Sequence, residues 1–239
     1  MKRKANNLTF FDHLDELRER LIKSVTVFLL ASCVAYQYKD HILAFIIKPV
    51  GKLIFTSPAD AFVTQLGLSF LGGFLLSLPV TVYQLWSFVA AGLKEEERRF
   101  ASIFGPASFV LFVLGTAFAY YVFVPFSLSF LLSFSNEHLL PMITVKDYFS
   151  YIVTLVFAFG VIFEFPLVIL FLTNIGIATP EFLIQKRRHA IVLIFIVAAL
   201  LTPPDGITQF VMAIPLIVLY EFSIVVAKIV YRNRVVYGP

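Results

Sequence analysis

The residue with the clearest chemical signal in this sequence is a single carboxylate inside a long apolar stretch. Glu164 lies in the segment from Asp147 to Asn174, about ten helical residues or roughly 15 Å from the end of that segment. Because a hydrocarbon core is about 30 Å thick, this depth is close to the middle of a membrane. An ionised carboxylate there costs about 2.5 kcal/mol or more, so such groups usually face a water-filled cavity, a polar partner or a substrate path. Two interpretations stay open: a protonated acid bonded to a neighbouring helix, or a group that lines a functional cavity.

A proline follows this carboxylate closely. Pro166 lacks a backbone N–H, so we expect it to bend the helix and to leave backbone carbonyls near Glu164 without their helical partners. Prolines recur inside the other apolar segments, and a bundle of bent helices is more apt to enclose a concavity than a bundle of straight ones. These further prolines are Pro79, Pro106, Pro125 and Pro215.

Acids and bases are mixed in two polar stretches, residues 12–21 and 94–99. The first predicts an amphipathic helix whose leucines Leu14, Leu17 and Leu21 share one stripe. One interpretation is a pair of solvated helices with ion pairs between residues about one turn apart, in which the acids between Asp15 and Glu19 pair with Arg18 and Lys23. The other is a cluster of carboxylates that binds a cationic ligand, for which the planar fork of arginine is the best match. The pattern alone does not decide between them.

Composition identifies an integral membrane protein. Of 239 residues, 59% are hydrophobic and 14% are charged, and the mean hydropathy is +0.89, which is far outside the usual range of a soluble domain. Cys33 is the single cysteine, and the four histidines are scattered, so we expect no disulfide and no metal site. The sequence contains no phosphate-binding loop and no nucleophile elbow, so we expect neither a cofactor nor catalysis.

The apolar runs predict an all-α membrane protein with six transmembrane helices, because lipid-facing backbone must be helical and the runs are too long for barrel strands. The expected spans are about 21–38, 65–91, 100–132, 148–173, 190–202 and 207–227, within a single membrane domain over residues 1–239. The fifth span covers only about 20 Å. It is either an element that docks a partner or deforms the membrane, or its ends extend into the flanking residues.

The basic residues predict the orientation. Fifteen of the 19 Lys and Arg residues fall in segments on one side of the predicted spans and four on the other. The positive-inside rule therefore places both termini in the cytoplasm. The net charge of +4 follows from this orientation and from contact with anionic membrane lipids, and does not indicate nucleic-acid binding.

Four blocks of this sequence closely resemble the TatC family, the multi-spanning component of the twin-arginine protein translocase. They are residues 13–20, residues 83–93 leading into 97–99, residues 159–166 and residues 201–205, and they occur in order and at matching spacing over essentially the whole chain. The resemblance implies a concave bundle of six helices in the prokaryotic plasma (inner) membrane, with both termini cytoplasmic. One departure is Ala91, where many members of the family carry proline.

The resemblance also implies roles for individual residues. Glu16 and Glu97 match the glutamates implicated in binding the two arginines of a signal peptide. The remaining matches are Arg18, Phe88, Arg98 and Arg99 around that site; Glu164, Tyr120 and Gln209 in an intramembrane cavity, the last two associated with docking of single-span partner subunits; and Pro49 and Asp205 in external loops important for transport.

These matches predict a receptor subunit of a protein export system. It would bind the twin-arginine signal peptide of folded cargo on the cytoplasmic face, self-associate and recruit single-span TatA/TatB-type subunits for transport driven by the proton motive force. The alternative is a small-solute or ion carrier that uses Glu164 as its coupling carboxylate. That alternative predicts paired discontinuous helices and more polar residues deep in the spans.

Overall fold

The computed structural model describes residues 10–93, 95–136, 138, 140–203 and 205–237, with the backbone alone described at 10, 95–102 and 233–237. These residues are almost entirely helical, apart from turns and isolated bridges such as that between Ile54 and Thr144. The predicted all-α class is confirmed. The chain divides into two compact units, Met1–Gly51 with Thr56–Phe109 and Lys52–Phe55 with Val110–Pro239. The single membrane domain stays a prediction.

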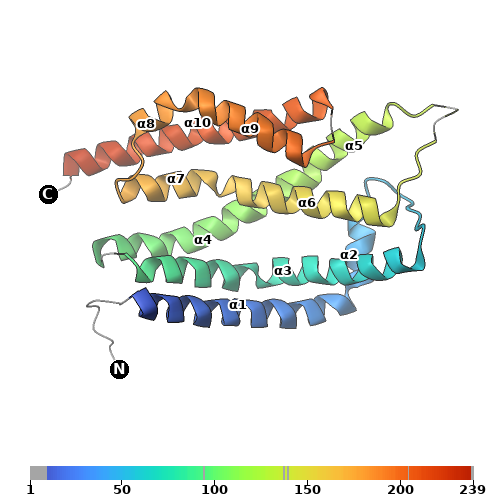
Figure 1. The fold of residues 1–239 in the computed structure, drawn as a ribbon, viewed down its shortest axis with the longest axis horizontal. Coiled ribbons are helices and arrows are strands. Elements are labelled where there is room, and N and C mark those ends of the chain that lie inside the picture. The colour runs from blue at the N-terminus through green and yellow to red at the C-terminus, as the bar shows by residue number, and fades with distance from the viewer. Residues whose placement is uncertain (1–9, 94, 137, 139, 204, 238–239) are drawn as a thin grey trace. The chain divides into compact units, whose positions relative to one another are not determined.

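The first unit is built on two long helices that lie side by side, α1 (Phe10–Gln37) and α3 (Pro58–Ala91) (Figure 1). Ser57 starts α3 as its N-cap, because its side chain accepts a hydrogen bond from the Ala59 N–H and Pro58 suits the first helical position. The two helices approach closely where Gly73 faces Ser32. A Cβ at position 73 would lie 2.6 Å from the Ser32 Cα, so only glycine fits there.

The short helix α2 (Lys39–Ile46) turns away from α1 by 79° at Tyr38. Lys39 donates a hydrogen bond from Nζ to the Gln65 Oε1 on α3 at 3.0 Å and lies 4.3 Å from the ring centroid of Tyr36. The bend contains neither proline nor glycine, and α2 contacts α3 through this hydrogen bond and through Ile42, whose side chain lies against Gly72.

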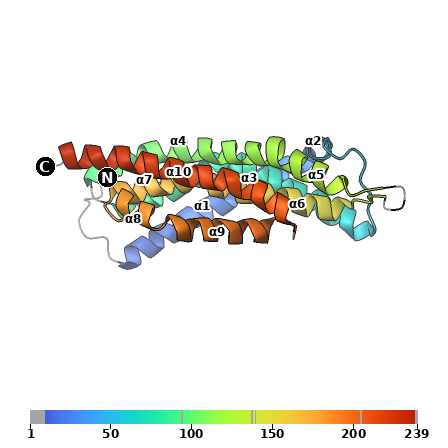
Figure 2. The ribbon, with the colours of Figure 1, turned by 90° about the horizontal axis from the view of Figure 1, so that it is seen from above.

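The second unit contains most of the remaining helices. Its core includes the fully buried Phe123 and Phe159, whose ring centroids are 5.1 Å apart, and α7 and α9 each pack against α10 (Figure 2). The division between the units falls inside α4. The elements of the chain after α3 are α4 (Glu95–Phe118), the π-helix η1 (Ala119–Phe123), α5 (Val124–Leu132), α6 (Val145–Phe163), α7 (Phe165–Asn174), α8 (Pro180–Gln185), α9 (Arg187–Leu201) and α10 (Gly206–Tyr237).

Four helices in the described residues are long and apolar enough to cross a membrane, and a fifth is added if the bent pair α1 and α2 counts as one span. The predicted fifth span corresponds to α9, whose 15 residues cover about 22 Å, less than the roughly 30 Å of a hydrocarbon core. That all six predicted segments cross the membrane stays a prediction. The predicted amphipathic helix and the first span form one continuous helix, α1, of 28 residues.

Candidate functional site

A carboxylate near the start of α1 is held in place by an arginine one turn later. Arg20 donates from Nε at 3.0 Å and from Nη2 at 2.5 Å to the same oxygen of Glu16, Oε1. Its third nitrogen, Nη1, donates to the Gln84 Oε1 on α3 at 3.2 Å. Glu16 and Arg20 are 23% and 24% exposed. The contact therefore ties α1 to α3 and fixes the Glu16 carboxylate at a partly buried position.

An aromatic stack lies beside this carboxylate. The His13 and Phe88 rings are stacked with their centroids 4.3 Å apart and their planes at 16°. The His13 Nδ1 is 4.0 Å from Glu16 Oε2, the oxygen that Arg20 does not use. The structure therefore brings together two residues that the sequence had placed in one site, Glu16 and Phe88, with His13 between them.

The arginine that holds Glu16, Arg20, is not among the predicted site residues. Arg18 is exposed and, among the described contacts, makes no ion pair with Glu16, whereas Arg20 does. The predicted pair between Glu19 and Lys23 is present at 2.6 Å. Sequence analysis missed the roles of Arg20 and Gln84. The four-residue spacing could have indicated Arg20, but nothing in the sequence marks Gln84, which is 64 residues away from its partner.

The second predicted carboxylate, Glu97, lies with Arg98 and Arg99 in the first turns of α4. Their backbone is helical, and their side chains lie outside the described residues.

Glu164 lies at the interruption between α6 and α7. Its side chain is half-buried, and its Oε1 is buried. Pro166 stands in the first turn of α7, and the Glu164 carbonyl accepts hydrogen bonds from the N–H groups of Leu167 and Val168, both at 3.0 Å. The predicted coincidence of helix break and carboxylate is therefore observed, although Val145–Asn174 still forms one span of 30 residues.

Tyr120 lies in η1, a single stretch of π-helix in the third predicted span. It is half-buried, and its ring packs against that of Tyr121 at 5.0 Å between centroids and nearly at a right angle. π-Helical turns are rare and occur often at functional sites. Of the three residues predicted to line an intramembrane cavity, Tyr120 lies in η1, Glu164 between α6 and α7, and Gln209 in α10. They therefore come from separate elements of the second unit.

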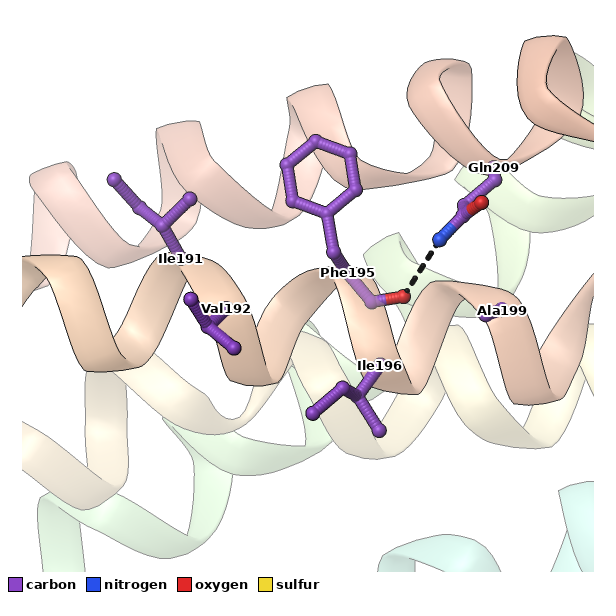
Figure 3. A pocket seen from close by; sticks show the side chains of 6 residues that line it. All are labelled: Ile191, Val192, Phe195, Ile196, Ala199 and Gln209. Atoms are coloured by element: carbon purple, nitrogen blue, oxygen red, sulfur yellow. Dashed lines mark hydrogen bonds between the residues drawn. The ribbon is translucent and has the colours of Figure 1, made fainter.

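Gln209 lines an apolar groove between α9 and α10 (Figure 3). Its Nε2 donates a hydrogen bond to the Phe195 backbone carbonyl at 3.0 Å. The groove has a volume of about 380 Å³ and its other lining residues are all apolar: Ile191, Val192, Phe195, Ile196 and Ala199. It therefore combines one amide with a wall of aliphatic and aromatic side chains.

The two residues predicted in external loops, Asp205 and Pro49, lie next to α10 and after α2. Asp205 caps α10, because its Oδ1 accepts a hydrogen bond from the Thr208 N–H at 2.7 Å and its Oδ2 accepts one from the Thr208 hydroxyl at 2.5 Å. Pro49 is exposed in the turn after α2, which ends at Gly51 with a φ of 82°. In the described residues no group of three or more histidine, cysteine or acidic side chains is arranged to hold a metal ion.

The comparisons with known proteins agree with one another. A protein-family model described as "Sec-independent protein translocase protein (TatC)" matches residues 12–215. The TatC protein of Carboxydothermus hydrogenoformans is 40% identical over 228 residues, which cover 93% of this chain and 94% of that protein. The TatCd protein of Bacillus subtilis is 39% identical over 223 residues, with 93% and 92% covered.

Solved structures give the same result. The crystal structure of a twin-arginine translocase receptor, TatC, superposes with a TM-score of 0.81 at 37% identity, and the match covers 91% of this chain and 99% of that one. A second crystal structure of such a receptor, in the detergent DDM, gives a TM-score of 0.82 at 36% identity. The chain therefore belongs to the TatC family and is a helical membrane component of a Sec-independent protein translocase, which is a protein-transport role and not an enzymatic one.

Proposed function

We propose that this chain is the receptor of a twin-arginine translocase and binds the arginine pair of a signal peptide at the cytoplasmic face. The observation that carries the proposal is the Glu16 carboxylate, which Arg20 holds beside the stacked rings of His13 and Phe88. The solved relative that this chain resembles is itself a twin-arginine translocase receptor.

Arginine recognition follows from the chemistry of this position. A carboxylate accepts charge-assisted hydrogen bonds, and the planar guanidinium delivers several donors in a fixed geometry that the lysine ammonium lacks. The stacked rings add a face on which a guanidinium can lie, a contact worth about 0.5–2 kcal/mol. We assign Glu97 as the second carboxylate, and Arg18, Arg98 and Arg99 as further residues of the binding site around the two carboxylates.

The second unit would serve passage and assembly. We assign Glu164 and Tyr120 to the path of the apolar part of an inserted signal peptide. The groove at Gln209 would dock a single-span TatA/TatB-type subunit, since a membrane helix with one polar side chain matches an apolar wall with one amide. Self-association would complete the receptor complex. The proton motive force would drive transport, at about 2.3 kcal/mol per charge per 100 mV.

The test is binding of a labelled signal peptide to the full chain in lipid nanodiscs, with an Arg-Arg peptide compared with its Lys-Lys version. We expect the wild type to prefer Arg-Arg and the Glu16→Ala plus Glu97→Ala variant to lose both affinity and preference. Glu19→Ala is the matched control, because this acid lies on the same helix but pairs with Lys23 at an exposed position. Equal binding of both peptides, unaffected by the double substitution, would contradict the proposal.

A further inference from the structure

The contact between Arg20 and Glu16 differs from an ordinary ion pair on a helix surface. The pair of Glu19 and Lys23 on the same helix has the same four-residue spacing, but its side chains are 68% and 53% exposed, and one hydrogen bond joins them. Arg20 and Glu16 are each about one quarter exposed, two hydrogen bonds join them, and a third fixes Arg20 to Gln84 on α3. Exposed pairs of the first kind contribute little, whereas a partly buried arginine with three placed donors has few alternative positions.

The two oxygens of Glu16 are in different environments. Both donors of Arg20 go to Oε1. The other oxygen, Oε2, is the one that faces His13, which is stacked on Phe88. An arginine that competed for the whole carboxylate would engage both oxygens in a fork-to-fork arrangement. Here it holds one oxygen and leaves the other directed toward the aromatic stack.

We propose that Arg20 and Gln84 are positioning residues of the signal-peptide site: they hold Glu16 by Oε1 so that Oε2 receives the incoming guanidinium beside Phe88. This inference rests on the receptor function proposed above and deepens it. Gln84 anchors Arg20, Arg20 anchors Glu16, and Glu16 contacts the ligand. The chain of contacts lies entirely within the first unit and joins α1 to α3.

Pre-positioning has a consequence for specificity. A carboxylate oxygen held in one position binds most tightly to a ligand whose donors are also held in a fixed geometry. The planar guanidinium therefore gains more affinity from a fixed oxygen than the freely rotating ammonium does. Loss of Arg20 would therefore lower the affinity for an Arg-Arg peptide more than for a Lys-Lys peptide. A general disturbance of α1 would lower both alike, so the ratio of the two affinities separates positioning from folding.

The experiment is a double-mutant cycle on the full chain in nanodiscs, with Arg-Arg and Lys-Lys peptides as the two probes. The variants are Arg20→Gln, Glu16→Gln and their combination, with Lys23→Gln as the matched control on the same helix. We expect Arg20→Gln to weaken Arg-Arg binding about tenfold, to reduce the preference over Lys-Lys, and to have no further effect once Glu16 is already glutamine. Lys23→Gln should bind like the wild type.

Two conservative variants extend the test. Arg20→Lys should recover part of the binding, since an ammonium can still reach Oε1, and Gln84→Leu should give a smaller loss than Arg20→Gln because it removes only the anchor. Circular dichroism and the yield of monodisperse protein in detergent would show that each variant folds.

The outcomes separate the two proposals. If Glu16→Gln binds like the wild type, the receptor site itself is wrong, and the inference falls with it. If Glu16→Gln weakens binding but Arg20→Gln binds as well as or better than the wild type, or its loss is fully additive with that of Glu16→Gln, the site stands and the positioning role is overturned.

Discussion

At the scale of single residues, Glu164 is a carboxylate that would be costly to bury in a membrane. Its place at the junction of α6 and α7, with a buried Oε1, keeps it within the bilayer-length segment Val145–Asn174. A carboxyl group at this depth usually faces a polar partner or a substrate path, because transfer of its charged form into hydrocarbon costs about 2.5 kcal/mol or more. If the group acts as a neutral hydrogen-bonding acid, an amide of the same shape can replace it.

We therefore predict that Glu164→Gln keeps most of the export activity and that Glu164→Leu loses at least tenfold, since leucine has no polar atom to face the path. The measurement is export of a folded reporter carrying a twin-arginine signal peptide, at two external pH values. Glu181→Leu, on an exposed residue of α8, is the control. Normal export by the leucine variant would exclude a role in the path, and a changed pH dependence in the glutamine variant would indicate that Glu164 carries protons.

The residue scale also shows the limits of sequence reasoning. Glu16 and Phe88 could be assigned to one site because their motifs are recognisable, and the structure places both beside His13. Gln84 could not be assigned, because its contact with Arg20 depends on the register of α1 against α3 and not on any local pattern. Arg18 is exposed, and its place in the site stays a prediction, whereas Arg20, which was not predicted, contacts both Glu16 and α3.

At the scale of elements, close packing of α1 on α3 sets the register that assembles the site. Gly73 allows this approach, since a Cβ there would meet the Ser32 backbone. We predict that Gly73→Ala destabilises the protein by about 1–3 kcal/mol, the usual cost of overpacking. The matched control is Gly105→Ala on α4, where an added Cβ would meet nothing within 4 Å. The free energy of unfolding in mixed micelles is the measurement, and equal stabilities of the two variants would show that the two helices can separate freely.

A second prediction at this scale concerns the groove between α9 and α10. Replacing Gln209 by leucine removes its single polar side chain and leaves the apolar wall intact. We expect Gln209→Leu to reduce disulfide cross-linking between a cysteine at position 192 and a cysteine in a single-span partner, several-fold, in a Cys33→Ser background. Gln185→Leu, outside the groove at the end of α8, should cross-link normally. Undiminished cross-linking of the Gln209 variant would mean that the amide does not select the partner.

The sequence indicated most elements through their apolar runs, and it placed the helix break at Glu164 through Pro166. It did not indicate α2 or the 79° bend before it. Sharp bends usually occur at proline or glycine, and Tyr38 is neither. Residues next to the bend contact α3, as Lys39 does at Gln65 and Ile42 at Gly72, and these contacts exist only when α3 is in place.

At the scale of the whole molecule, the distribution of basic residues predicts the topology. Fifteen of 19 Lys and Arg residues lie in segments assigned to one side, so we propose that both termini are cytoplasmic. A cysteine introduced at the exposed Ser135 should react with an impermeant maleimide in intact cells, and one at the exposed Lys186 only after permeabilisation. The Cys33→Ser protein is the background for both. The reverse labelling pattern would invert the topology and place Glu16 on the wrong side for a receptor.

The family also decides between the two functions that the sequence left open. Relatives throughout the comparison are translocase proteins, and none supports a small-solute or ion carrier. An intramembrane carboxylate alone therefore does not indicate a coupling site. The role of such a carboxylate depends on the protein that surrounds it.

The most direct test of the receptor site is to map where a signal peptide touches the protein. A peptide with a photoreactive group next to its Arg-Arg pair would be cross-linked to the full chain in nanodiscs, and the modified residues identified by mass spectrometry. We expect adducts on the first turns of α1 around His13 and Glu16 and on the end of α3 around Phe88, and we expect excess Arg-Arg peptide, but not Lys-Lys peptide, to remove them. Adducts confined to the groove of α9 and α10, with none on α1 or α3, would contradict it.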